Sequence, residues 1–203
     1  MRKLLICLAA TAAVCSAQAQ SGDFTGFSAG GNLAMNAGGV ASSTSDGLKN
    51  DIGSQQSIGI GAFANYGLSL GRGSVLALGL DYSLSDVKVQ EFQDATNNQT
   101  LKIQNIWSLS IAPGMMISDK TLAYFKLGFE NGKTAISGSV AKESSKNING
   151  NSWGFGMKSF FNKDTYLQIE AKQTNFGSMQ FDGVASDLKF RATTGSVGVG
   201  FMF

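Results

Sequence analysis

Residues 191–203 read RATTGSVGVGFMF, and this C-terminal stretch decides the fold class of the chain. Within it Val197, Val199, Phe201 and Phe203 alternate with small or polar residues, a period of two that is typical of a β-strand with one apolar face. In an open sheet such a strand would leave an exposed, adhesive edge, whereas a closed barrel gives it a neighbour on both sides. The stretch therefore predicts the last strand of a barrel.

The N-terminus has the features of a secretory signal peptide. Arg2 and Lys3 precede the apolar residues 4–14, and the small-x-small sequence AQA follows at positions 17–19. The apolar run is shorter than the about 20 residues that a membrane-spanning helix needs. We therefore predict a signal peptide over residues 1–19 and one barrel domain over residues 20–203.

Composition narrows the class of protein further. Both cysteines, Cys7 and Cys15, lie inside the predicted signal peptide, so the mature chain would carry no disulfide. Cys15 leaves a lipoprotein as the alternative, although the bulky Val14 stands where a lipobox needs a small residue. Beyond residue 19, 14 basic residues balance 14 acidic ones, and this neutrality gives no indication of nucleic-acid binding. The 26 glycines and single proline favour many strands joined by tight turns.

Seven further segments show the same alternation of apolar and polar residues. Together with the last one, the predicted strands are residues 24–35, 57–70, 76–85, 103–111, 123–130, 153–161, 167–172 and 191–203. Long polar stretches follow the odd-numbered strands, at residues 36–56, 86–100, 134–150 and 175–188, and short turns follow the even-numbered ones. Alternating long loops and short turns are the sequence signature of a transmembrane β-barrel.

This pattern resembles the small eight-stranded outer-membrane barrels of bacteria, the family of OmpX and the OmpA transmembrane domain. The fold class expected is all-β, an eight-stranded antiparallel up-and-down transmembrane β-barrel. A soluble β-sandwich is the alternative, but the strict alternation of loop lengths and the apolar terminal strand favour the barrel. Val199, Phe201 and Phe203 also resemble the C-terminal assembly signal of that family.

The resemblance implies where the protein works and which partners it meets. We expect the bacterial outer membrane, with both termini in the periplasm and the four long loops outside. The partners expected are outer-membrane lipid and lipopolysaccharide, and, during biogenesis, periplasmic chaperones and the barrel-assembly machinery. The protein is expected to be a monomer, with no further periplasmic domain after its last strand.

Residue types that usually carry catalysis are missing. The sequence has no histidine, and beyond residue 19 it has no cysteine, so histidine bases, thiol nucleophiles and Cys/His metal sites are excluded. A Ser-Lys or Asp-Glu site is conceivable, but no sequence pattern points to one. We therefore predict a protein that is not an enzyme and needs no cofactor or metal.

Charged residues fall on the face of the strands that is predicted to point into the barrel. They are Asp81, Lys126, Glu130, Glu170 and Lys172. Counted from the turns, three of them (Asp81, Lys126 and Glu170) should meet in the middle of the barrel. They would form either a salt-bridged plug, since the interior of an eight-stranded barrel is just wide enough for side chains to fill, or a selectivity filter or gate. We favour the plug.

Aromatic and basic residues on the outward face are predicted to meet the membrane interfaces. The expected girdles are Tyr82, Trp107, Phe129 and Trp153 at the outer rim, and Phe27, Tyr66, Phe161 and Phe203 at the inner one. Arg191 shares its face with Val197, and the twelve steps to Phe203 span about 31 Å, more than the roughly 25 Å apolar band. Arg191 is therefore expected at the outer rim, where it would either contact lipopolysaccharide phosphates or simply be solvated.

Two functions fit this sequence. The first is a closed, side-chain-filled barrel that acts as a structural or adhesin-like surface protein through its four loops, which are rich in Ser, Thr, Asn, Lys and Gly. The alternative is a small, porin-like channel for ions or small solutes. The sequence names no ligand or receptor for the loops.

Overall fold

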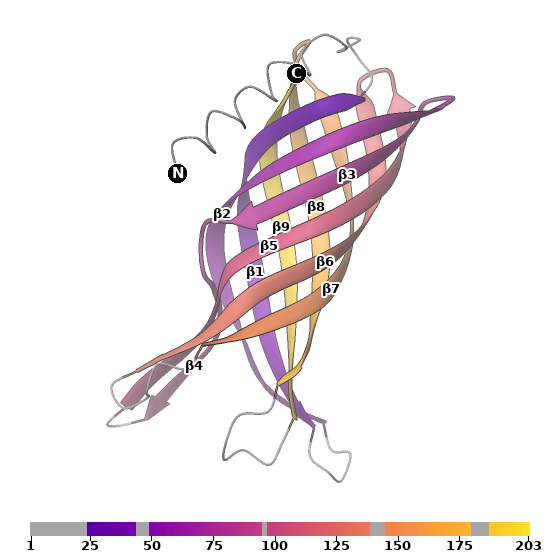
Figure 1. Ribbon diagram of the computed structural model, residues 1–203. Helices are drawn as coiled ribbons and strands as arrows, with labels where there is room; N and C mark the ends of the chain where they lie inside the picture. The colour runs from indigo at the N-terminus through magenta and orange to yellow at the C-terminus, as the bar shows by residue number, and fades with distance from the viewer. Residues whose placement is uncertain (1–23, 44–48, 95–96, 139–144, 180–186) are drawn as a thin grey trace, which may run out of the picture.

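The computed structural model describes residues 24–43, 49–94, 97–138, 145–179 and 187–203, so the predicted signal peptide lies outside the described residues. This part of the chain forms nine β-strands (Figure 1). They are β1 (Gly26–Ser43), β2 (Lys49–Gly71), β3 (Ser74–Ser83), β4 (Val87–Asp94), β5 (Asn97–Ser118), β6 (Thr121–Gly138), β7 (Ser145–Phe160), β8 (Thr165–Met179) and β9 (Asp187–Met202). It contains no helix with the length and apolarity needed to cross a membrane.

The strands close into an antiparallel barrel of eight positions. Their order is β3-β2-β1-β9-β8-β7-β6-β5-β4, and a further pairing of β3 with β5 closes the ring. β3 pairs with the second half of β5 and β4 with its first half, so β3 and β4 together occupy one position in the wall. The first and last strands are neighbours, with Ala29 opposite Phe201. The predicted all-β, eight-stranded barrel is therefore confirmed.

The alternation of side chains also follows the prediction over most of the wall. Apolar residues such as Leu33, Ile58, Phe155 and Val197 point outward and are exposed. Their neighbours in sequence point inward, where glycines, polar residues and aromatic rings fill the interior. The buried side chains of this protein are those that the barrel wall encloses, since the fold has no core between two packed layers.

The four long loops were predicted to be longer than the structure shows. β1 continues to Ser43 and β2 starts at Lys49, while most of residues 86–100 form β4 and the beginning of β5. β6, β7, β8 and β9 extend likewise into the segments predicted as loops. The apolar alternation stops where the strands leave the apolar zone, but backbone hydrogen bonding continues along the hairpins. Sequence periodicity therefore detected the part of each strand that carries an apolar face, which is most of β3 and β9 but only about half of the longest strands.

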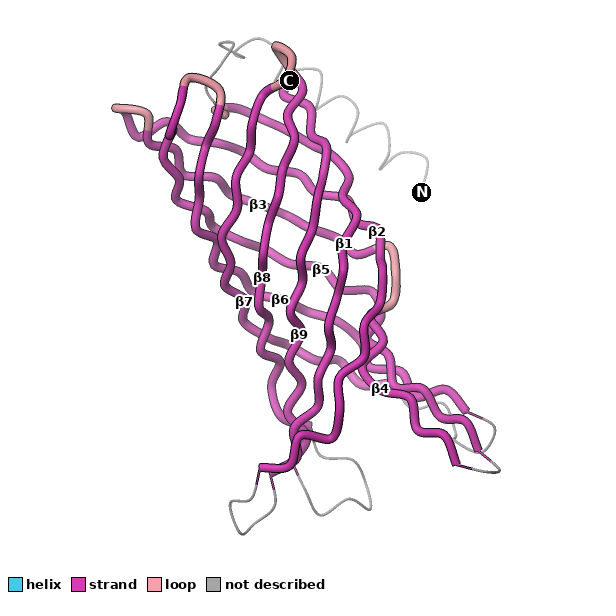
Figure 2. Tube along the Cα trace, turned by 180° about the vertical axis from the view of Figure 1, so that it is seen from behind, coloured by secondary structure: helices cyan, strands magenta, loops and turns pink. Residues whose placement is uncertain are grey.

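These extensions all lie at one end of the barrel, opposite Gly26 and Phe203. We call it the loop end, and the opposite end, with the turn at Gly71–Gly73, the terminal end. At the loop end, the hairpin of β4 and the start of β5 leaves the barrel to one side, whereas the β1–β2 hairpin continues along the wall (Figures 1 and 2).

One predicted side-chain orientation is wrong. The period of two over the predicted strand 103–111 puts Ile103 on the same outward face as Trp107, but its side chain points inward and is 1% exposed. The reason is a bulge in β5, where the register with β6 shifts between Gln104 and Trp107 and Asn105 has a φ of 50°. An extra residue reverses the side-chain alternation, and asparagine tolerates the left-handed backbone conformation that the bulge uses.

Candidate functional site: the charged interior of the barrel

The middle of the barrel encloses six charged side chains. Five of them are the residues that the sequence analysis assigned to the interior, and the sixth is a lysine on β7. They are Asp81 on β3, Lys126 and Glu130 on β6, Lys158 on β7, and Glu170 and Lys172 on β8. Three carboxylates thus face three ammonium groups, and their formal charges cancel.

Lys126 links two opposite walls of the barrel. Its Nζ lies 3.0 Å from Asp81 Oδ2 and 3.1 Å from Glu170 Oε2. β3 and β8 lie on opposite sides of the ring, and β6 stands midway between them. The side chains of Lys126 and Glu170 are 6% and 7% exposed, and that of Asp81 is 19% exposed. Three charges therefore cross the bore with little access for water.

Neutral hydroxyl groups hold both carboxylates in place. Tyr124 donates its hydroxyl hydrogen to Glu170 Oε2 over 2.8 Å, and Ser108 donates to Asp81 Oδ2 over 3.0 Å. A buried ion pair is tolerated only when further hydrogen bonds satisfy its remaining lone pairs. The network meets this condition.

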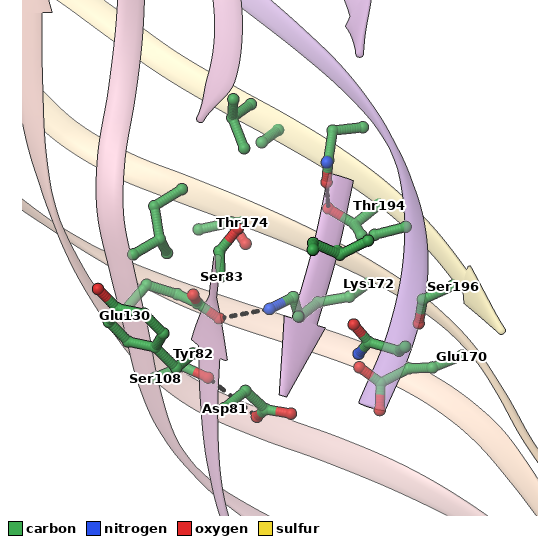
Figure 3. A pocket seen from close by; sticks show the side chains of 18 of the residues that line it. Asp81, Tyr82, Ser83, Ser108, Glu130, Glu170, Lys172, Thr174, Thr194 and Ser196 are labelled. Carbon is green, nitrogen blue, oxygen red and sulfur yellow. Dashed lines mark hydrogen bonds and ion pairs between the residues drawn. The ribbon is translucent and has the colours of Figure 1, made fainter. Parts of the chain in front are cut away.

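A second ion pair lies next to the first on the same two strands. Lys172 Nζ is 2.9 Å from Glu130 Oε1, and the Glu130 side chain is 2% exposed (Figure 3). Because β6 and β8 each contribute one acid and one lysine, the two strands are cross-linked twice through the interior. These contacts bring together all five residues predicted from the sequence.

Lys158 was not among the predicted site residues, although its strand position faces inward. It is buried, and its Nζ lies 5.5 Å from the ring centroid of Tyr124 and 5.4 Å from that of Tyr166. Cations are attracted to the faces of such rings. No carboxylate in the described part of the chain lies within ion-pair distance of Lys158. The signal that could have revealed it was its place in the same inward series as Gly154 and Gly156.

An apolar cluster closes the barrel interior at the terminal end. Its buried members are Phe24, Phe63, Val75, Leu122, Phe160 and Tyr166. Phe24 precedes β1, and its ring stacks on Phe160 at 4.2 Å and meets Tyr166 edge-on at 5.5 Å. Phe24 was predicted as the start of the first strand, but it precedes β1 and its ring fills the mouth of the barrel.

Inward glycines make room for the large rings. A side chain at Gly156 would collide with the ring of Tyr124, and one at Gly200 would collide with the ring of Tyr166. Gly156 of β7 and Gly200 of β9 thus leave the space that the tyrosines of the neighbouring strands β6 and β8 occupy. They leave less free volume than their number suggests.

A small polar cavity remains on the loop-end side of the ion pairs. Its volume is about 80 Å³, enough for a few water molecules. Figure 3 shows the side chains around it, among them Glu130, Lys172, Thr194 and Ser196. Asn36 accepts a hydrogen bond of 2.8 Å from the Thr194 hydroxyl at its wall.

The predicted girdle and assembly residues lie on the outer face. Tyr82, Phe129 and Trp153 are exposed there, and the ring of Trp107 packs 6.4 Å from that of Phe129. At the terminal end, Tyr66, Phe161 and Phe203 are exposed, and Phe27 packs against Phe203 at 5.7 Å. Val199 and Phe201 of β9 point outward as well. Their roles at an interface or in assembly stay predictions.

Arg191 also points outward, near the loop end of β9. It is exposed, and its Nε donates a hydrogen bond of 3.1 Å to Asn175 Oδ1 on β8. This contact fixes the guanidinium against the wall and leaves its terminal nitrogens for other partners. The outward direction of this side chain was predicted from its place in the strand, whereas its contact with Asn175 was not.

The arrangement of charges and rings is better suited to closing the barrel than to catalysing a reaction. Each of the three carboxylates in the interior is paired with a lysine, and the described residues contain no group of three or more acidic, histidine or cysteine side chains that could hold a metal ion. Ion pairs across the bore and aromatic rings at one mouth are features that close a barrel.

Comparisons with known proteins identify the class to which this barrel belongs. Residues 6–203 match the family described as outer membrane protein beta-barrel domain. Ail, the attachment invasion locus protein of Yersinia pestis, solved with the heparin analogue sucrose octasulfate, is 15% identical with a TM-score of 0.51, over 87% of this chain and 99% of that one. Neisserial surface protein A is 13% identical with a TM-score of 0.51, over 85% and 97%. At such identities the likeness concerns the fold. No curated protein sequence matches the chain.

Replacing Lys126 tests how far the barrel depends on the cross-bore network. We expect Lys126→Met to lower the free energy of unfolding by about 3–5 kcal/mol, because it leaves two buried carboxylates without a counter-charge. The measurement is urea unfolding of the refolded barrel in lipid vesicles. Lys133→Met is the matched control, because Lys133 is an exposed lysine on the same strand.

A triple variant, Lys126→Met with Asp81→Asn and Glu170→Gln, should recover much of the lost stability, since it removes all three charges together. Equal stability of Lys126→Met and the wild type would contradict a structural role for this network.

Proposed function

The chain belongs to the outer membrane protein beta-barrel domain family, and from this premise we propose that it is a closed barrel of the bacterial outer membrane whose loop end serves as a structural or adhesin-like interaction surface. The proposal includes no catalytic activity and no cofactor. It rests on one observation above all, the closure of the interior by paired charges and aromatic rings.

Two barriers in series support the closed interior. Lys126 reaches carboxylates on opposite walls, and the cluster around Phe24 and Tyr166 fills the terminal end. An ion on its way through the barrel would have to break a buried ion pair and also displace close-packed rings. Each step is costly in a low-dielectric interior.

A narrow channel is the second candidate, and the polar cavity of about 80 Å³ beside Glu130 and Lys172 favours it. The cavity could hold water on the loop-end side of the ion pairs. It would become part of a path only if the ion pairs and the aromatic cluster both opened.

Planar-bilayer recording separates the two candidates. We expect the purified, refolded protein to give no reproducible single-channel steps in concentrated potassium chloride, because both barriers block the bore. Bilayers treated with detergent alone provide the baseline. Steps of uniform size that appear only with the protein would favour the channel.

The orientation of the barrel is part of the proposal. We propose that residues 1–19 are a signal peptide removed on export, that periplasmic chaperones and the barrel-assembly machinery insert the chain, and that both termini face the periplasm. The loop end would then face the outside. The asymmetry between the long hairpins there and the short turns at the terminal end supports this orientation.

Binding by intact cells tests the surface role. We expect cells that carry the protein to retain matrix or serum proteins that cells without it do not, and to lose this binding when residues 44–48, 139–144 and 180–186 are replaced by short glycine-serine turns. Lys163→Ala, at a turn of the terminal end, is the control and should leave binding unchanged. Undiminished binding after replacement of the three segments would contradict the proposed surface.

Arg191 is proposed to contact the phosphates of lipopolysaccharide. Its exposed position near the loop end, and the planar guanidinium that matches two phosphate oxygens, support this contact. We expect Arg191→Ala to leave the barrel folded but to reduce the rise in melting temperature that added lipopolysaccharide produces. Lys120→Ala at the terminal end is the control. An unchanged rise in the Arg191→Ala protein would show that Arg191 is merely solvated.

A further inference from the structure

Phe24 lies outside the strand ladders, although its ring is buried in the mouth of the barrel. The pairing of β1 with β2 begins at Gly26, which lies opposite Gly67, and the pairing of β1 with β9 begins at Ser28. Phe24 is nevertheless only 5% exposed. We call Phe24 and Thr25 the latch, because they leave the barrel wall at Gly26 and enter the bore.

Gly26 is the point at which the chain turns from the wall into the mouth. Its φ is 91°, in the left-handed region that glycine adopts without the steric cost met by other residues. The next residue is already fixed in the wall, since Phe203 N–H donates to Phe27 O over 2.9 Å. The direction of the chain therefore changes over a single residue.

Five strands supply the site that the latch occupies, which we call the seat. Its members are Phe63 on β2, Val75 on β3, Leu122 on β6, Phe160 on β7 and Tyr166 on β8. The Phe24 ring stacks on Phe160 and meets Tyr166 edge-on, the two arrangements that aromatic pairs prefer. Because five strands contribute to the seat, it forms only when the barrel has closed, and docking of Phe24 follows closure.

Lys158 lies one layer deeper than the seat. It is two residues from Phe160 on the inward face of β7, and its side chain is enclosed by the barrel. Its Nζ lies 5.4 Å from the ring centroid of Tyr166, the ring that Phe24 meets edge-on. The latch therefore separates the solvent at the terminal end from a buried amine.

We propose that the terminal mouth is a binding site for one aromatic ring, and that Phe24 fills it as a latch that can leave without breaking the wall. Release exposes one ring and ends its contacts with Phe160 and Tyr166, but it breaks no pairing of the two ladders, so it requires less free energy than unfolding. The open seat offers an apolar site to another aromatic group, and Lys158 then meets water. The inference goes beyond the proposed function and does not depend on what the loop end binds.

Gly67 provides a way to displace the latch without altering any ring. A Cβ at this position would collide with the carbonyl oxygen of Phe24, and its three nearest atoms all belong to Phe24 and Thr25. The φ of Gly67 lies outside the left-handed region, so the backbone itself accepts alanine there. Gly31→Ala is the matched control, because the nearest atom to a Cβ at Gly31 is the carbonyl oxygen of Gly61, at an ordinary contact distance of 3.5 Å.

The test measures how fast Lys158 is methylated by formaldehyde and cyanoborohydride in the mature barrel, residues 20–203, in nanodiscs. Mass mapping of peptides reports each lysine separately. The variants are Phe24→Ala, which removes the ring, Gly67→Ala, which displaces the latch, and the control Gly31→Ala. Lys120, in a turn at the terminal end, gives the rate of an exposed lysine. Heat-modifiable migration on gels verifies that each barrel is folded.

We expect Lys158 to react far more slowly than Lys120 in the wild type and in Gly31→Ala. Phe24→Ala and Gly67→Ala should each raise its rate about tenfold or more, because burial of the phenyl ring holds the mouth shut. Lys126, which is paired deeper in the bore, should stay unreactive in every variant. Benzene should slow the reaction again in Phe24→Ala, since a free ring can enter the vacant apolar seat, and should leave the wild type unchanged.

A wild-type Lys158 that reacts as fast as Lys120 would overturn the proposal, whatever the variants do. Unchanged rates in Phe24→Ala and Gly67→Ala would also overturn it, as would an equal rise at Lys126, because the barrel would then have loosened as a whole. Failure of benzene to slow the reaction would overturn the ring-binding site. The ion pairs of Lys126 still cross the bore when the latch is open. The bilayer and cell-binding results therefore do not depend on the latch, and failure of this inference is distinguishable from failure of the proposed function.

Discussion

The central constraint in this barrel is the position of one ammonium group between two carboxylates on opposite walls. Lys126 can meet Asp81 and Glu170 together only if β3, β6 and β8 hold a fixed register around the ring. A slip by one residue on any of these strands would turn its charged side chain toward the apolar exterior. The other two charged side chains would then stay in the interior without a full set of partners. The charges add specificity to a wall whose apolar outer band would by itself accept registers that differ by two residues.

Much of this could be predicted from the sequence, because the period of two reports directly on which side chains face in. Asp81, Lys126 and Glu170 share the inward parity and a similar distance from their turns, and these two facts sufficed to bring them together. The predicted orientation of Ile103 was wrong because a single residue in the left-handed conformation, Asn105, reversed the alternation of side chains. Such a bulge has no periodic signature. The inward direction of Lys158 was readable from the same period of two, but its aromatic neighbours, Tyr124 and Tyr166, were not.

The inward glycines show that a sequence pattern can mark the lumen face without revealing how full the lumen is. Their alternation in β7 and β9 marked the lumen face, but a glycine in sequence gives no indication of what approaches it. Tyr124 and Tyr166 reach across from neighbouring strands into the space above Gly156 and Gly200. The pairing of a large residue on one strand with an absent side chain on the next is a tertiary property, and it turns an apparently hollow interior into a packed one.

The extension of the strands beyond the apolar zone has a consequence for recognition. Segments that composition described as loops are hydrogen-bonded hairpins over much of their length, from Val40 to Ser43 in β1 and throughout β4. A flexible loop loses conformational entropy when a partner immobilises it, and this loss lowers the affinity. Residues already fixed in a ladder have met that entropic cost during folding, so contacts made by the hairpins return a larger share of their energy as binding.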